Sequence, residues 1–147
     1  FLTGNIQLYI TQREVNMKKS LSTIAGVATL ALSGQVFAAG NVVSEEIWVG
    51  AKIYDRAFGR GCGACHDISS NPNLIANIKD GSLTKDKFSE IVKSGKNGMP
   101  PAMDAIMKVG PVKKVKYSEA QAIDAIYNYL AGRADGSVPA GKVKKAK

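Results

Sequence analysis

The chain has 147 residues, with 20 Lys and Arg against 12 Asp and Glu, two Cys and one His. This length predicts one domain. The excess of positive charge is not interleaved with aromatic residues, which argues against a nucleic-acid partner and favours an acidic protein partner. Three Cys and His side chains are too few for a structural zinc site, which needs four such ligands.

The first predicted element is an export signal over residues 17–38. Met17 begins a short positively charged segment, an apolar stretch follows, and small residues ending at Ala38 are typical of a signal-peptidase site. The apolar stretch is short and ends in polar residues, so we do not expect a stable membrane span. Residues 1–16 are expected to be an upstream extension that is not part of the protein. The pattern predicts a periplasmic protein.

The first helix of the domain is predicted from a Ser44 N-cap to about Phe58. Two glycines, Gly59 and Gly61, are expected to end it. Apolar residues at helical spacing predict its buried face: Ile47, Ala51, Tyr54 and Phe58.

The motif Cys62-Gly63-Ala64-Cys65-His66 directly follows this helix. C-x-x-C-H is the attachment signature of a c-type haem. The two thiols can add across the two vinyl groups of one porphyrin, and the adjacent His66 can bind the iron. Because the chain has no other Cys or His, the sequence predicts one haem c per chain and excludes a second haem.

A thioredoxin-like redox pair is the main alternative for the two cysteines. That interpretation needs a buried strand running into the motif. The residues before Cys62 instead have the pattern of a helix end and a glycine turn. A plain disulfide or a chance pair leaves the single His after Cys65 without an explanation. We therefore prefer haem attachment.

A short amphipathic stretch and one helix are predicted between the motif and residue 95. A loop at 67–73 leads to a short amphipathic stretch at 74–78, and Thr84 caps a helix at 85–93. The helix at 85–93 is expected to turn its apolar residues inward: Phe88, Ile91 and Val92. A turn or short helix is predicted at 102–108.

The last helix is predicted over about residues 119–131. Ser118 and Gln121 form a capping box at its start, and Gly132 is expected to end it. The domain is therefore expected to cover residues 39–137. The Lys-rich tail, 138–147, is predicted to be disordered.

A methionine is the natural candidate for the second axial ligand, because the chain has no second His. Met99 lies in a loop with a glycine before it and two prolines after it, which restrict the backbone. Met103 and Met107 are spaced by one helical turn and are expected to fill core space. Met99 is the preferred ligand, with Met103 as its main alternative; Met107, a Lys or an open site are further alternatives.

From about Ser44 to Leu130 the chain resembles the class I monohaem cytochromes c. Four features carry the resemblance, and all are visible in the sequence: the helix before C-x-x-C-H, Asn71-Pro72-Asn73-Leu74, Gly98-Met99-Pro100-Pro101, and Tyr129-Leu130 in the last helix. It implies that the carbonyl of Pro72 accepts a hydrogen bond from His66. It also implies that Tyr129 and Leu130 cross the first helix, at either Gly50 with Tyr54 or Tyr54 with Phe58.

The segment between Met99 and Ser118 is longer than in many such proteins and carries four lysines: Lys108, Lys113, Lys114 and Lys116. A solvated basic loop is the simplest interpretation. A docking surface for an acidic redox partner beside the haem is the functional alternative.

The resemblance implies an all-α, small class I cytochrome c fold, with helices packed around one covalent haem. It implies a periplasmic electron carrier, not an enzyme, whose iron cycles between Fe(II) and Fe(III) with His66 and Met99 as axial ligands. A weaker similarity points to the cytochromes that accept electrons from quinoprotein alcohol (methanol) dehydrogenases. The alternative function is a haem c enzyme or sensor with an open distal site for peroxide or a gas.

Overall fold

The computed structural model describes residues 41–147; the predicted upstream extension and export signal, residues 1–38, lie outside them. The described part is mostly helical, which confirms the predicted all-α class. Its elements are, in chain order, β1 (Val42–Val43), α1 (Glu45–Arg56), the 3₁₀ helix η1 (Ala57–Gly59), α2 (Gly63–His66), α3 (Leu74–Lys79), α4 (Lys85–Ser94), α5 (Met103–Met107), α6 (Gly110–Val115), α7 (Glu119–Asp135) and β2 (Lys144–Lys145).

Side-chain caps start the longer helices where the sequence predicts them. The Ser44 hydroxyl accepts a hydrogen bond from the backbone N–H of Ile47, 3.3 Å away, at the start of α1. Thr84 caps α4 in the same way. At the start of α7, the Ser118 hydroxyl and the Gln121 side chain each bond the other residue's backbone N–H, which completes the predicted capping box.

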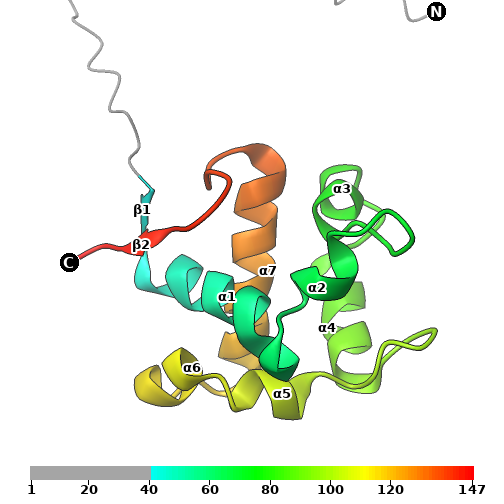
Figure 1. Ribbon diagram of the computed structural model, residues 1–147, viewed down its shortest axis with the longest axis horizontal. Coiled ribbons are helices and arrows are strands. Elements are labelled where there is room, and N and C mark those ends of the chain that lie inside the picture. Colours follow the sequence, from blue (N-terminus) through cyan, green and yellow to red (C-terminus); the bar gives the residue numbers. More distant parts are fainter. Residues whose placement is uncertain (1–40) are drawn as a thin grey trace, which may run out of the picture. The chain divides into compact units, whose positions relative to one another are not determined.

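Helices α1 and α7 form the central packing of the domain and cross one another (Figure 1). A Cβ atom at Gly50 would lie 2.0 Å from the carbonyl oxygen of Ala125, so the two backbones meet where α1 has no side chain. The rings of Tyr54 and Tyr129 pack beside this point with centroids 5.9 Å apart. Of the two pairings left open by the sequence, the structure has Gly50 with Tyr54.

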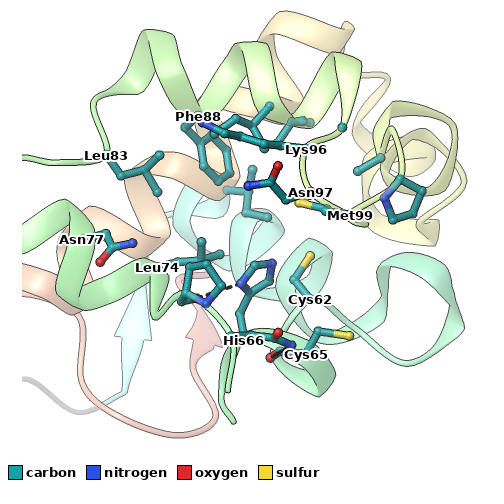
Figure 2. A pocket seen from close by; sticks show the side chains of 18 of the residues that line it. Cys62, Cys65, His66, Leu74, Asn77, Leu83, Phe88, Lys96, Asn97 and Met99 are labelled. Atoms are coloured by element: carbon teal, nitrogen blue, oxygen red, sulfur yellow. Dashed lines mark hydrogen bonds between the residues drawn. The ribbon is translucent and has the colours of Figure 1, made fainter. Parts of the chain in front are cut away.

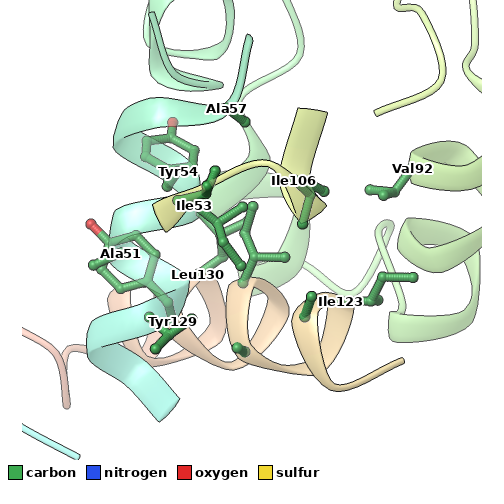
Figure 3. Packing of buried hydrophobic residues seen from close by; sticks show 14 of the residues in the cluster. Ala51, Ile53, Tyr54, Ala57, Val92, Ile106, Ile123, Tyr129 and Leu130 are labelled. Atoms are coloured by element: carbon green, nitrogen blue, oxygen red, sulfur yellow. The ribbon is translucent and has the colours of Figure 1, made fainter. Parts of the chain in front are cut away.

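Aliphatic side chains fill the interior around this crossing, and helices α4, α5 and α6 contribute to it (Figure 3). The largest fully buried side chains are Val49, Ile53, Ile106, Val112, Ile126 and Leu130. Since burying one such side chain contributes about 1.5–3 kcal/mol, this cluster is the main source of stability that the side chains supply.

Phe58 does not lie on the buried face of α1, so that prediction is wrong. Helix α1 ends at Arg56, and Phe58 lies in η1 with φ of 58°, a left-handed conformation. The changed backbone direction turns the ring away from the core, and 46% of Phe58 is exposed. Ala57 takes the buried position instead.

A short helix, α6, replaces the loop expected between Met99 and Ser118. Pro111 lies in its first turn, where a missing N–H is tolerated, and Val112 is buried. The lysines Lys113 and Lys114 are exposed. The helix forms because one face of this basic segment packs on α1 and α5.

Helix α7 continues through Gly132 to Asp135, whereas the sequence predicts its end four residues earlier, at about residue 131. A Cβ at Gly132 would lie 2.5 Å from a methyl group of Val138. This glycine is required for close packing, whereas Gly136, with φ of 85°, makes the left-handed turn that ends the helix.

The prediction of a disordered tail is also wrong. Val138 and Val143 are buried, and β2 pairs in parallel with β1, with Val42 opposite Lys144. Lys145 also forms an ion pair with Glu45. Two valines spaced to reach the core therefore order this Lys-rich segment.

None of the helices over residues 41–147 is both long and apolar enough to cross a membrane.

Candidate haem site

A cavity of about 1260 Å³ contains all five site residues that the sequence predicts: Cys62, Cys65, His66, Pro72 and Met99 (Figure 2). It lies between α2, α4 and the segments that follow each of them. This volume exceeds the range of roughly 300–1,000 Å³ typical of small-molecule and cofactor sites. The cavity is therefore large enough to hold a large cofactor.

The haem-attachment motif forms a single helical turn, α2, at the edge of this cavity. The backbone N–H of His66 donates to the carbonyl oxygen of Cys62 at 3.0 Å. Residues three and four positions apart share one side of a helix, so Cys62, Cys65 and His66 project from the same side of α2. Both thiols and the imidazole thus meet on one surface, as attachment to one porphyrin requires.

A glycine turn brings this motif against α1. Gly61 has φ of 84°, and a Cβ there would lie 2.5 Å from the carbonyl oxygen of Tyr54. The next residue, Cys62, donates its backbone N–H to that same oxygen at 2.7 Å. Gly61 is required because the chain reverses here in close contact with the helix.

Both thiols are free, and no strand leads into the motif from the described residues before it. Burial raises the pKa of the Cys62 thiol to about 11. A thioredoxin-like pair needs a lowered thiol pKa, since the thiolate is the reactive species. The environment of Cys62 therefore argues against the redox-pair alternative.

The imidazole of His66 is oriented by the loop that follows it. Its Nδ1 donates a hydrogen bond to the carbonyl oxygen of Pro72 at 2.9 Å, the contact that the family resemblance implies. Because Nδ1 carries the proton, the lone pair of Nε2 is free to bind a metal. The side chain of Asn71 donates to the carbonyl oxygen of Cys65 at 2.9 Å and ties the same loop to α2.

Met99 lies across the cavity from His66, in the turn between α4 and α5 (Figure 2). Lys96 and Met99 exchange two backbone hydrogen bonds of 3.0 and 2.9 Å, and Gly98 between them has φ of 86°. Met103 and Met107 pack against the core and do not line the cavity. Of the candidate methionines, the structure brings only Met99 to the site.

The remaining cavity wall suits a haem. Helix α4 supplies Phe88, Ile91 and Val92, which confirms their predicted inward direction. The cavity lining contains three cationic side chains and one carboxylate. This excess of positive charge favours binding of the two propionate carboxylates of the cofactor. These charged residues are Arg60, Lys87 and Lys96 against Glu90.

One polar pair beside the motif was not predicted. The hydroxyl of Tyr54 donates a hydrogen bond to Asp67 at 2.6 Å. No sequence pattern identifies this pair, because it joins a helix to a loop residue 13 positions away through the reversal at Gly61.

Comparison with known proteins identifies the family of the chain. Residues 46–130 match the family described as Cytochrome C oxidase, cbb3-type, subunit III. The chain is 36% identical over 135 residues to cytochrome c-555 of Methylococcus capsulatus, an alignment that covers 87% of this chain and 95% of that protein. No solved structure matches the chain.

The helical fold and the C-x-x-C-H turn in a large cavity define a small c-type cytochrome domain. The chain belongs to the cytochrome c family, as a class I monohaem c-type cytochrome. It carries covalently bound haem c and functions as an electron carrier.

Proposed function

We propose that the protein is a periplasmic electron carrier whose haem is held by thioethers to Cys62 and Cys65 and by axial bonds from His66 and Met99. One observation carries this proposal: a single-turn attachment motif and one methionine face each other across the same cavity. The hydrogen bond from His66 to Pro72 supports the proposed role of that imidazole.

When bound, the haem supplies the one-electron exchange between Fe(II) and Fe(III). The protein's residues set its properties. A methionine ligand raises the reduction potential relative to a second histidine. The aliphatic and aromatic residues of α4 that line the cavity would keep water away from the haem ring and would limit the change in solvation that accompanies electron transfer. In this proposal the protein makes and breaks no substrate bonds.

Replacement of Met99 tests the ligand assignment. Met99→Ala is expected to remove the weak long-wavelength absorption band that a thioether bound to ferric haem produces, and to lower the reduction potential. Met103→Ala is the matched control, because Met103 packs outside the cavity, and it is expected to retain the band.

The outcomes separate the alternatives. If Met103→Ala loses the band and Met99→Ala retains it, the iron ligand is Met103 and not Met99. A wild-type protein without the band, which binds cyanide or carbon monoxide rapidly, would instead favour a haem enzyme or sensor with an open distal site.

We further propose an acidic redox protein as the partner and the basic segment after Met99 as its docking surface. The four lysines named in the sequence are all exposed. Lys108 also lines a second hollow of about 520 Å³ with Arg56 and Phe58, and Phe58 lines the haem cavity as well. This adjacency favours approach of a partner close to the haem. A quinoprotein alcohol dehydrogenase is the partner we propose, on the resemblance of the Met99 loop and this basic segment.

A further inference from the structure

The haem-attachment turn is held at both of its ends by contacts with helix α1. At the first end, the carbonyl oxygen of Tyr54 accepts the backbone N–H of Cys62. At the second end, the hydroxyl of the same tyrosine donates to Oδ1 of Asp67, which follows His66 directly. One residue of α1 thus holds the turn through its backbone and through its side chain.

The pair is closely packed against the motif. A Cβ at Gly63 would lie 2.4 Å from Oδ2 of Asp67 and 3.0 Å from the ring of Tyr54. Asp67 therefore occupies the space that a side chain at the first intervening position of C-x-x-C-H would need. Its own backbone N–H donates to the carbonyl oxygen of Gly63 at 3.0 Å, which closes α2.

The two groups differ in how they meet the solvent. Tyr54 is 8% exposed and its ring packs on Tyr129, whereas Asp67 is exposed as a residue. Burial and the hydrogen bond to Asp67 raise the pKa of Tyr54 far above its usual range, so the phenol remains a donor. A donated hydrogen bond of 2.6 Å partly neutralises the carboxylate that receives it.

We propose that Tyr54 is a positioning residue for the haem. Through Asp67 it holds the end of the turn that carries His66, and it limits the negative charge that this carboxylate places near the iron. The inference rests on the proposed function, because it takes His66 as the iron ligand. A negative charge close to the iron stabilises Fe(III) and lowers the reduction potential, so the pair sets that potential.

Two substitutions separate these effects in the haem-loaded protein. Tyr54→Phe keeps the ring against Tyr129 but removes the donor, and we expect a lower reduction potential because the carboxylate loses its neutralising partner. Asp67→Asn keeps an oxygen that can accept from Tyr54 but removes the charge, and we expect a higher potential. The double variant is expected to resemble Asp67→Asn, since no charge remains to be neutralised.

Two controls match these changes. Asp55→Asn removes an exposed carboxylate next to Tyr54 on α1. Tyr127→Phe removes a phenol that donates to Leu83 at 3.5 Å, on α7 and outside the attachment turn. Both controls are expected to leave the potential close to that of the wild type.

Shifts of opposite sign in Tyr54→Phe and Asp67→Asn, with a double variant that matches Asp67→Asn, support the proposal, because a fold loosened by Tyr54→Phe would lower the potential of the double variant as well. Equal shifts, or potentials that match the controls, overturn it. If Tyr54→Phe does not retain haem, the sign of the Asp67→Asn shift decides. A wild-type protein without the band of a bound methionine would count against the proposed function, and not against this pair.

Discussion

At the scale of single residues, a glycine decides how the two longest helices meet. At Gly50 the backbone of α1 lies so close to Ala125 that any side chain must push the helices apart. The close contact depends on the absence of a side chain at this position. The conformation of Gly50 is helical and could be adopted by alanine, so the cost of a substitution is purely steric.

We predict that Gly50→Ala destabilises the protein by about 1–3 kcal/mol, the usual cost of an overpacked interior. Chemical denaturation of the haem-loaded protein measures this. Gly110→Ala is the matched control, because a Cβ at Gly110 meets nothing within 4 Å and its φ is not positive. Equal stability of the two variants would contradict the close crossing.

The site residues differ in how far the sequence could predict them. Cys62, Cys65 and His66 follow from a contiguous motif whose spacing is set by the chemistry of attachment. The lack of a second His makes a methionine the natural candidate for the second axial ligand. The glycine and prolines of its loop favour Met99 over Met103. The bond between Tyr54 and Asp67 could not be foreseen, because it depends on a chain reversal and not on a periodic pattern.

At the scale of elements, predictions succeeded where a local signal acts alone. Ser44, Thr84 and the capping box at Ser118 each start a helix through hydrogen bonds within one turn. Predictions failed where packing from elsewhere decides. Gly132 resembles a helix stop, yet it lies inside α7 because Val138 covers it. The composition of the tail predicts disorder, yet β2 is ordered by contacts with β1.

The order of the tail can be tested at one buried side chain. Val143→Ala removes two methyl groups from the core and is expected to lower the free energy of unfolding by about 1.5 kcal/mol. Val42→Ala changes the same residue type in β1, where Val42 is 56% exposed, and should have almost no effect. Thermal unfolding compares the two variants, and equal melting temperatures would contradict the packing of the tail.

At the scale of the whole molecule, charge governs encounters more than it governs the fold. The chain carries 20 basic against 12 acidic residues. Over the described residues only two ion pairs are present, Lys85 with Asp124 and Lys145 with Glu45. Most of the basic side chains over residues 41–147 therefore form no ion pair and can act on an approaching molecule, and long-range attraction raises association rates more than affinities.

If the basic segment docks an acidic partner, electron transfer must slow as salt is added. The rate constant with an acidic redox protein is expected to fall with ionic strength, because exposed charges are screened over about 8 Å at physiological salt. The double variant Lys113→Gln and Lys114→Gln should weaken this dependence more than Lys79→Gln with Lys142→Gln. A rate that does not change with salt would contradict the proposed docking surface.

The crossing of α1 and α7 also affects the order of events during folding. The first helix of the domain and its last helix form the central contact, so the core cannot close until nearly the whole chain has been synthesised (Figure 1). Until then Cys62 and Cys65 belong to an open chain. Haem attachment and core closure are thus separable events, and we expect a haem already held at these two positions to act as a folding nucleus that shortens the search of one chain end for the other.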